Sequence, residues 1–355
     1  MNAIDQVQQV LRDTVRAAAE KGERLRIVGG GSKSFYGRAV EGQPVVTTGL
    51  GGIVAYEPTE LVITAGAGAP LQEVEEVLAE RAQMLAFEPP HFGNKATLGG
   101  TIACGFSGPR RPYAGSARDF VLGVRCLNGK GEVLRFGGQV MKNVAGYDIS
   151  RLMVGSLGSL GVILEVSLKV LPKPEREVTL RYDLPVTQAI ERMNRWAGEP
   201  LALSATAYYA DALWVRLSGA QGAVSTAHGT LGGALVADDA RFWRELREHE
   251  LEFFRDEQPL WRLSLPPATP HLPIAGEWLI DWGGAQRWLK TNVMAQAIRS
   301  ATAAVGGHAT LFRGGDHRGE VFTPLAPVSL HIHRELKARF DPKGIFNVGC
   351  MYADF

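Results

Sequence analysis

Hydrophobic residues near the start of the chain recur every three or four positions, with polar and charged residues between them. The repeating residues are Ile4, Val7, Leu11 and Val15. This spacing places them on one face and predicts an amphipathic helix. Gly22 directly follows Lys21 and suits a C-terminal cap, so we expect the helix to end there.

Short runs rich in β-branched residues follow, separated by turns. The runs predicted as strands cover residues 25–28, 44–48, 53–56, 61–65, 121–127, 132–136 and 162–170. The turn at Asn128-Gly129 lies between two of them and predicts a β-hairpin. Pro70 is expected at the first position of a helix whose apolar stripe begins with Leu71 and Val74. Strands interleaved with helices predict an α+β or α/β domain.

The second half has a weaker pattern, and Pro172 and Pro174 mark the boundary that we predict before it. Its predicted strands cover residues 178–182, 203–209, 213–217 and 278–282, and its predicted helices carry Ile190, Phe242 and Trp288. Helices alternating with hairpins predict an α+β cap. The chain is therefore divided into residues 1–173, a cap of residues 174–338 and a C-terminal segment of residues 339–355.

The composition is that of an ordinary globular protein, with 355 residues and a formal net charge of +1. This charge gives no reason to expect nucleic acid or an anionic membrane as the main partner. The three cysteines, Cys104, Cys126 and Cys350, form no CxxC pair, so we expect no iron–sulfur cluster or zinc site held by this chain alone. The sequence also lacks a signal-peptide pattern and a long apolar run, and a cytoplasmic protein is expected.

Glycine is concentrated in three clusters, at residues 29–31, 99–115 and 155–161. Glycine lets the backbone approach a ligand closely, and successive N–H groups can bind phosphate. The first cluster follows a predicted strand, but it has neither the Walker A spacing nor a GxGxxG sequence that opens a helix. The alternative is a set of turns between short strands. Because two clusters flank a hairpin and a third precedes them, we favour a cradle for an extended dinucleotide.

Several cationic and histidine residues are weaker candidates. Lys33 and Arg110 lie in or near the glycine clusters and could pair with phosphate, whereas a solvated surface position is the alternative for each. His91 lies beside two prolines and is assigned no role. His331 and His333 are two positions apart in a predicted helix, so they do not face each other and we expect no shared metal ion.

Four motifs in a fixed order carry a resemblance to a known family. They are RIVGGGSK at residues 26–33, ATLGGTIA at residues 96–103, KNVAGYD at residues 142–148 and FDPKGIFNVG at residues 340–349. With these motifs the chain resembles the FAD-binding domain of the p-cresol methylhydroxylase and vanillyl-alcohol oxidase type. Within that type it is similar to the FAD-binding subunits of glycolate oxidases.

The resemblance implies an α+β fold in which two subdomains clasp FAD and a cap with an antiparallel sheet follows. The Gly29 loop and the Thr97–Ala103 loop would hold the pyrophosphate, residues 155–162 would lie against the adenosine, and Asn347 would return to the flavin. The residues that the resemblance assigns to FAD are Val28, Gly29, Gly30, Gly31, Ser32, Lys33, Pro90, Thr97, Leu98, Gly99, Gly100, Ile102, Ala103, Arg110, Gly115, Asp148, Gly158, Gly161, Val162 and Asn347.

The chain also departs from the family pattern. No histidine follows the Gly29-Gly30 pair, which implies non-covalent FAD. Leu157 stands where related 2-hydroxy-acid dehydrogenases carry an acidic residue, and Val348 replaces the usual proline. The related 2-hydroxy-acid dehydrogenases also carry a metal-linked segment of the Gly-His-x-Gly-Asp-Gly-Asn-x-His kind in the cap. This chain has no such segment. These departures favour an accessory flavin subunit, so no catalytic residue and no metal ligand is assigned.

The implied function is that of the FAD-binding subunit of a multi-subunit glycolate oxidase, which oxidises glycolate to glyoxylate. The expected partners are a hydroxy-acid-oxidising flavin subunit and an iron–sulfur subunit. Through this complex the chain is expected to associate with the inner face of the membrane. One alternative is a self-sufficient FAD-dependent 2-hydroxy-acid dehydrogenase that uses His308 and Arg313 as base and carboxylate clamp. The other is a scaffold subunit that has lost FAD, against which the intact glycine loops argue.

Overall fold

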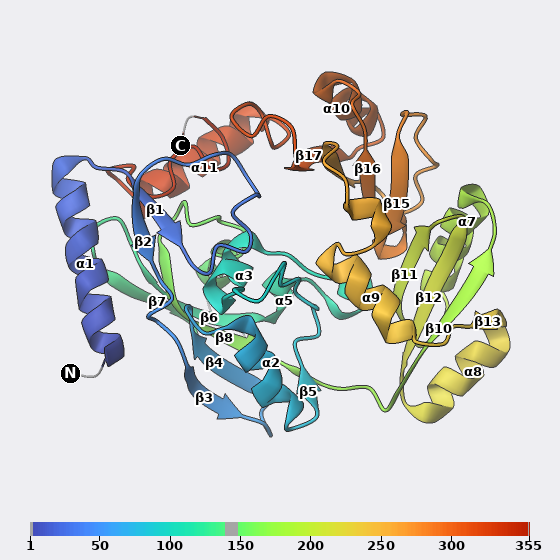
Figure 1. Ribbon diagram of the computed structural model, residues 1–355. Coiled ribbons are helices and arrows are strands. Elements are labelled where there is room, and N and C mark those ends of the chain that lie inside the picture. The colour runs from blue at the N-terminus through green and yellow to red at the C-terminus, as the bar shows by residue number, and fades with distance from the viewer. Residues whose placement is uncertain (1–2, 139–147, 354) are drawn as a thin grey trace.

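The computed structural model describes residues 3–138, 148–353 and 355. Residues 142–147 of the third family motif therefore lie outside the described residues. Figure 1 shows two regions side by side: one built mainly from the N-terminal half, and one built around a large sheet of the second half. The red C-terminal helix lies back beside the blue N-terminal elements. The two ends of the chain thus share the first region.

The first region is organised around a five-stranded antiparallel sheet of order β3-β4-β8-β6-β7. Its strands are β3 (Ile53–Glu57), β4 (Val62–Gly66), β8 (Val162–Lys169), β6 (Val121–Leu127) and β7 (Val133–Gly137). Two small pairs flank it: the parallel strands β1 (Leu25–Val28) and β2 (Gln43–Val46), and β5 (Gln83–Met84) with β9 (Leu171–Pro172). The predicted hairpin is confirmed as β6 and β7.

The described residues of the N-terminal half form six helices in this region. They are α1 (Ala3–Lys21), α2 (Leu71–Ala79), α3 (Leu98–Cys104), α4 (Arg111–Ala114), α5 (Ala117–Phe120) and α6 (Ile149–Leu152). The prediction of α1 is confirmed. Pro70 is the N-cap residue of α2, so its predicted place at the first helical position was wrong by one residue. The segment expected as a Thr97–Ala103 loop is α3, because the Thr97 hydroxyl accepts a hydrogen bond from the Gly100 N–H and caps the helix.

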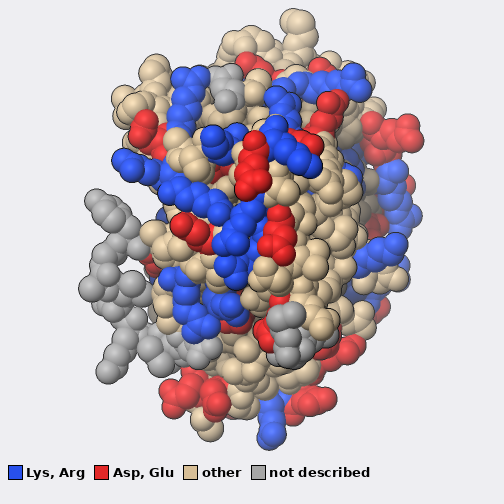
Figure 2. All heavy atoms as spheres, turned by 90° about the vertical axis from the view of Figure 1, so that its left-hand side faces the viewer, with Lys and Arg blue, Asp and Glu red and all other residues tan. Residues whose placement is uncertain are grey.

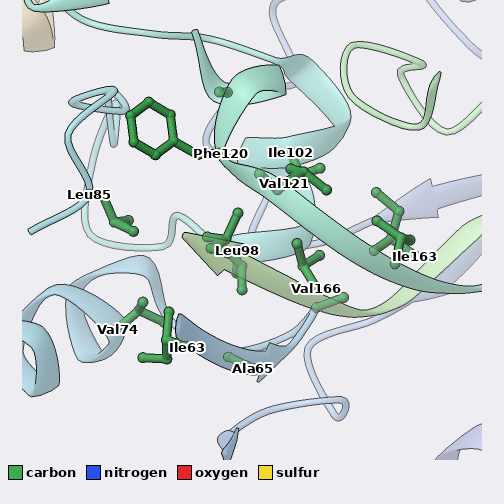
Figure 3. Packing of buried hydrophobic residues seen from close by; sticks show 14 of the residues in the cluster. Ile63, Ala65, Val74, Leu85, Leu98, Ile102, Phe120, Val121, Ile163 and Val166 are labelled. Atoms are coloured by element: carbon green, nitrogen blue, oxygen red, sulfur yellow. The ribbon is translucent and has the colours of Figure 1, made fainter. Parts of the chain in front are cut away.

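The core of the first region lies between the sheet and the helices α2 and α3. Strand β8 is buried at every position except Lys169, since it pairs with β4 on one side and β6 on the other. Figure 3 shows side chains of β4, α2, α3, β6 and β8 pointing toward one another, among them Ile63, Val74, Leu98 and Val166. Burial of this apolar surface fixes α3 against the sheet.

The second region is an eight-stranded antiparallel sheet of order β13-β10-β12-β11-β15-β16-β14-β17. The strands are β10 (Arg176–Asp183), β11 (Leu203–Tyr209), β12 (Ala212–Gly219), β13 (Ala234–Leu235), β14 (Leu260–Ser264), β15 (Glu277–Asp281), β16 (Gln286–Lys290) and β17 (His308–Arg313). Its helical segments are α7 (Val186–Ala197), α8 (Gln221–Leu231), α9 (Asp239–Glu248), η1 (Glu252–Phe254), η2 (Trp282–Gly284) and α10 (Ala295–Ala304). This sheet confirms the predicted antiparallel cap.

One element of the cap was predicted wrongly. Trp288 and Leu289 were placed in a helix, whereas they belong to strand β16. All five residues of β16 are buried, and the strand lies between β15 and β14. A strand buried on both faces loses the polar–apolar alternation by which strands are recognised. The following helix, α10, begins only at Ala295.

The two regions meet through a cluster of ion pairs. Glu88 accepts from Arg110 of the same region and, across the interface, from Arg216 of β12, at 2.9 Å in the latter pair. Arg110 also pairs with Glu177 of β10 at 2.6 Å. Burial alone would raise the pKa of Glu88, but Arg216 and Arg110 hold that pKa below its ordinary value. These buried pairs fix the cap against the first region.

Helix α11 (Pro327–Phe340) returns the chain to the first region. The buried Lys337 ammonium donates to the carbonyl oxygens of Ser159 and Phe346, both at 2.7 Å, and pairs with Asp341 at 2.8 Å. Phe346 then lies beside Leu25 in a parallel bridge. The predicted boundary near residue 173 falls between β9 and β10, and the division into three domains stays a prediction.

The surface is mixed in charge. Figure 2 shows the face that carries α1, where basic side chains form a band and acidic side chains lie beside them. Next to α1, Arg125 donates to Gln8 and pairs with Glu165, which also pairs with Arg135. Such a balanced face gives no large single-sign field. Among the helices of the described residues, none is long and apolar enough to cross a membrane.

Candidate functional site

A cavity of about 380 Å³ lies in the first region, within the size range of ligand pockets. Its walls are the loop after β1, the start of α3, the turn at residues 155–161 and the C-terminal segment. The predicted residues that line it are Val28, Gly29, Gly30, Gly31, Ser32, Lys33, Thr97, Gly99, Gly100, Ala103, Gly158, Gly161 and Asn347. Three sequence motifs thus converge on one cavity, which we name the dinucleotide cavity.

The loop after β1 offers backbone donors to this cavity. The N–H groups of Gly30, Gly31, Ser32 and Lys33 find no acceptor among the described residues. Backbone N–H groups in folded proteins are nearly always paired with protein, water or ligand. A run of such donors facing a cavity is an anion-binding arrangement. The loop therefore fits the pyrophosphate of a dinucleotide.

The glycines of the cavity serve two different purposes. A Cβ on Gly30 would overlap the carbonyl oxygen of Lys95, and one on Gly29 would lie 2.5 Å from the Thr97 hydroxyl oxygen. These two glycines let the loop pack against the segment before α3. A Cβ on Gly100 would meet only the Thr97 hydroxyl, at 3.2 Å. Gly100 therefore has room for a ligand rather than for protein.

The charges around the cavity have one sign. Arg26, Lys33 and Arg38 line it, and no Asp or Glu is found among its described lining residues. Lys33 is 8% exposed, and its ammonium lies 3.2 Å from the carbonyl oxygen of His91. Burial lowers the pKa of Lys33. A cationic rim with unpaired N–H groups suits a ligand with two phosphates.

The C-terminal segment closes the cavity through Asn347. Its side-chain oxygen accepts from the Ile27 N–H at 2.8 Å, and its side-chain nitrogen donates to the carbonyl oxygen of Leu157 at 2.6 Å. Asn347 has a φ of 40° and Leu157 a φ of 51°, which is uncommon for residues other than glycine. The Asn347 amide thus joins β1 to the turn at residues 155–161, and it shapes the cavity through the backbone.

Seven predicted residues do not line the dinucleotide cavity. Leu98, Ile102 and Val162 are fully buried in the cores, and Gly115 caps α4. Pro90 lines a small second cavity toward the cap, and Arg110 pairs with Glu88 and Glu177. Asp148 caps α6 and pairs with Arg151. The assignment of these residues to FAD stays a prediction, as it does for the residues that line the cavity.

Several lining residues were missed by the sequence reasoning. They are Tyr36, Arg38, Thr47, Cys104 and Cys350 among others. Burial raises the pKa of Cys104 to about 11 and that of Cys350 to about 12, so both thiols are protonated at neutral pH. Tyr36 and Arg38 directly follow the glycine loop, and Cys350 directly follows the last motif. Their nearness to motif residues is the signal that could have found them.

The residues proposed for a self-sufficient dehydrogenase are not brought together. His308 and Arg313 stand at opposite ends of β17, about 16 Å apart by the rise of a strand. Neither lines the dinucleotide cavity. Within the described ranges, no group of three or more His, Cys, Asp or Glu side chains is arranged to hold a metal ion.

The chain is similar in sequence to known proteins that bind FAD or belong to glycolate oxidases. Residues 6–137 match the family described as FAD binding domain. Over 346 residues the chain is 49% identical to the glycolate oxidase subunit GlcE of Escherichia coli (strain K12), covering 98% of this chain and 97% of that protein. The chain belongs to the GlcE family of glycolate oxidase subunits. FAD is therefore the cofactor of its N-terminal domain, as predicted.

More distant relatives match this GlcE-family chain over a smaller share of the sequence or only in structure. The glycolate oxidase subunit GlcD of Bacillus subtilis (strain 168) is 38% identical over 108 residues, which cover 30% of this chain and 23% of that protein. In structure, 4-ethylphenol oxidase from Gulosibacter chungangensis superposes with a TM-score of 0.73 at 14% identity, covering 98% of this chain and 88% of that one. This likeness confirms the predicted fold.

Proposed function

We propose that this chain is the FAD-carrying subunit of a multi-subunit glycolate oxidase that converts glycolate to glyoxylate. The observation that carries the proposal is the match with GlcE along nearly the whole chain, together with a dinucleotide cavity that has free N–H groups. In this reaction the CH–OH group of glycolate loses two electrons and two protons, one proton from the carbon and one from the hydroxyl. Bound FAD supplies the two-electron oxidation chemistry in enzymes of this kind.

The chain's own residues support a role in holding and relaying rather than in substrate oxidation. Oxidation of a CH–OH group needs a base for the hydroxyl proton. The described lining of the dinucleotide cavity contains no imidazole and no carboxylate. Lys33 and Arg38 line the cavity instead, where their positive charges would attract the phosphates of a dinucleotide. The proton-removing step therefore belongs to a second, hydroxy-acid-oxidising flavin subunit.

The electrons leave through an iron–sulfur subunit. All three cysteines of this chain are free, Cys126 and Cys350 are buried, and burial raises the pKa of each of these two to about 12. Thiols of this kind are poor cluster ligands because ligation needs the thiolate. The cluster thus belongs to a partner. From the sequence, we propose that the complex lies in the cytoplasm or at the inner face of the membrane.

The test is the absorption spectrum of the purified chain under anaerobic conditions, before and after glycolate is added. We expect flavin bands that glycolate does not bleach. Addition of the purified partner subunits should then permit bleaching. Bleaching of the lone chain would replace the proposal with a self-sufficient dehydrogenase. A chain that cannot be loaded with FAD would favour the scaffold alternative.

A further inference from the structure

Basic side chains from three separate segments gather around the turn of the β6–β7 hairpin, at residues 128–131. Two come from α1, one from the turn itself, and two from the end of α11 and the loop after it. They are Arg12, Arg16, Lys130, Arg339 and Lys343. We name this set the cationic patch. It is separate from the dinucleotide cavity and from the small second cavity toward the cap, because none of its residues lines either of them.

Hydrogen bonds and close packing hold the three segments together. The Arg12 Nε donates to the carbonyl oxygen of Gly131 at 3.5 Å. The Arg16 side chain lies so close to Gly131 that a Cβ there would be 2.6 Å from the Arg16 Cγ. From the same turn, the Gly129 N–H donates to the carbonyl oxygen of Phe340 at 2.9 Å. Helix α1 and the end of α11 therefore meet at one turn.

The turn that carries the patch is held rigidly. Asn128 is 4% exposed, and its side-chain oxygen accepts from the N–H groups of Lys130 and Glu132, both at 3.0 Å. The buried carboxylate of Asp341 fixes the adjoining segment by accepting from the N–H groups of residues 345 and 346. Groups that are already ordered lose less conformational entropy when they bind a partner. The patch is therefore preorganised for contact.

The cations of the patch have no acidic partner. Among the described residues, none of the five lies within ion-pair distance of a carboxylate. The neighbouring carboxylate of Asp13 accepts from the neutral side chain of Gln9 at 2.9 Å. That of Glu132 accepts from the neutral side chain of Asn128 at 2.8 Å. Elsewhere on the surface, an exposed arginine such as Arg241 pairs with a glutamate one helical turn away. The patch thus leaves positive charge free for a partner.

The distribution of charge indicates the kind of partner. Figure 2 shows that the face carrying α1 holds acidic side chains beside its band of basic ones. An anionic membrane is negative throughout and would repel these acidic neighbours, whereas a protein can place its carboxylates opposite the cations alone. Three of the five cations are arginines, which bind carboxylates through two parallel hydrogen bonds and are enriched at protein interfaces. The patch therefore fits a carboxylate-rich protein surface.

We infer that the cationic patch is the docking surface for the iron–sulfur subunit, which meets it with a carboxylate-rich face. The choice of this subunit rests on the proposed function, whereas the acidic chemistry rests on the unpaired cations. The patch adjoins the wall of the dinucleotide cavity. Phe340, which accepts from the turn, ends α11, and Lys337 of this helix donates to the carbonyl oxygen of Phe346, next to the cavity-lining Asn347. A subunit docked here lies against the segment that closes the cavity.

The test measures the Kd between the FAD-loaded full-length chain and the purified iron–sulfur subunit by isothermal titration calorimetry. We expect the Kd to rise at least about tenfold between about 50 mM and about 500 mM salt, because ions screen exposed charges. Arg16→Glu with Lys130→Glu should weaken binding at least about tenfold at low salt. Arg339→Glu with Lys343→Glu, which alters the patch from another segment, should do the same. Both variants should keep FAD, because these residues do not line its cavity.

The matched control makes the same change of charge on the cap. It combines Arg195→Glu of α7 with Arg244→Glu of α9, both at exposed positions, and should bind the iron–sulfur subunit as the parent protein does. An unchanged Kd in the two patch variants, or an equal loss in the control, would overturn the inference. So would patch variants that keep the iron–sulfur subunit but lose self-association or binding to vesicles of phosphatidylglycerol and phosphatidylcholine. Should one patch variant not fold, the other answers the same question.

The inference and the proposed function fail in different ways. A parent chain that binds FAD and the iron–sulfur subunit, and binds that subunit equally well after reversal of the patch, would overturn this inference alone. A parent chain that holds FAD but does not bind the iron–sulfur subunit would overturn the partner named in the proposed function, and the inference with it. A chain that cannot hold FAD would overturn the proposed function itself.

Discussion

Two cavities of this protein are built from different parts of the chain. The dinucleotide cavity is made largely of backbone, from the loop after β1, the start of α3 and the turn at residues 155–161. The small second cavity toward the cap is made of side chains that come from both regions, such as Phe106, Arg262 and Trp288. A site of backbone depends on glycine and on loop geometry, whereas a site of side chains depends on how two surfaces meet. The two sites should therefore fail in different ways when they are altered.

The largest effect is expected where backbone packs on backbone. Gly30→Ala would drive a Cβ into the carbonyl group of Lys95, which cannot move aside as a flexible side chain could. We expect a loss of about 4 kcal/mol or more in unfolding free energy, and loss of FAD. Denaturant unfolding and flavin absorbance measure the two effects.

Gly100→Val is the matched control within the same cavity, because its Cβ meets only the Thr97 hydroxyl. It should keep the fold within about 1 kcal/mol, the usual cost of a tolerated substitution, and still lose FAD. Normal flavin affinity in Gly100→Val would show that this part of the cavity does not hold the cofactor. Full stability of Gly30→Ala would show that the loop does not depend on its packing against Lys95.

The next largest loss of stability is expected where helix α11 returns the chain to the first region. Lys337→Met would leave the carboxylate of Asp341 buried without its cation, and the carbonyl groups of Ser159 and Phe346 without their donor. Removal of one partner of a buried ion pair costs about 3–5 kcal/mol. Thermal unfolding would measure this cost. Lys343→Met, a nearby exposed lysine, should leave stability unchanged, and an equal loss there would contradict the role of the pair.

The last effect depends on pH and concerns the cap side. Burial raises the pKa of Asp281 to about 7, from an ordinary value of 3.8. Between these pH values the folded protein holds a proton that the unfolded chain has lost, so this residue's contribution to stability falls as the pH rises. Asp281→Asn keeps an oxygen that can accept from the Trp282 N–H but carries no charge.

Melting temperatures of Asp281→Asn and of the parent protein between pH 4 and pH 8 test this. The variant's stability relative to the parent should improve as the pH rises from about 4 to about 7 and then level off. A constant difference at every pH would mean that Asp281 titrates as an ordinary surface carboxyl.

The sequence predicted the backbone-built part of the molecule better than the part built from side chains. Strand β1, its glycine loop and the β6–β7 hairpin follow local rules, so their residues could be named in advance. The wrongly predicted β16 shows the limit, because a strand buried on both faces has no alternation to detect. The contact of Arg262 with Tyr36 joins positions 226 residues apart, so no local sequence pattern could predict it.

Asn347 lies between these two cases. Its motif marked it as a residue near the flavin, and it does line the dinucleotide cavity. Yet both polar atoms of its amide are bonded to backbone, at Ile27 and Leu157. Motif spacing could find the place of this residue but not its hydrogen-bond partners, since these depend on three segments meeting in space.

The return of the C-terminal segment to β1 has a consequence for the order of events during biosynthesis. Leu25 donates to the carbonyl oxygen of Ile345 and accepts from the N–H of Asn347, so the last residues of the chain complete a wall that the first residues began. While the protein is on the ribosome, this wall has no partner strand. The cavity can close only once residues 345–347 have left the ribosome. We therefore expect FAD to be bound after these residues emerge, and a chain truncated before residue 340 to lack the cofactor.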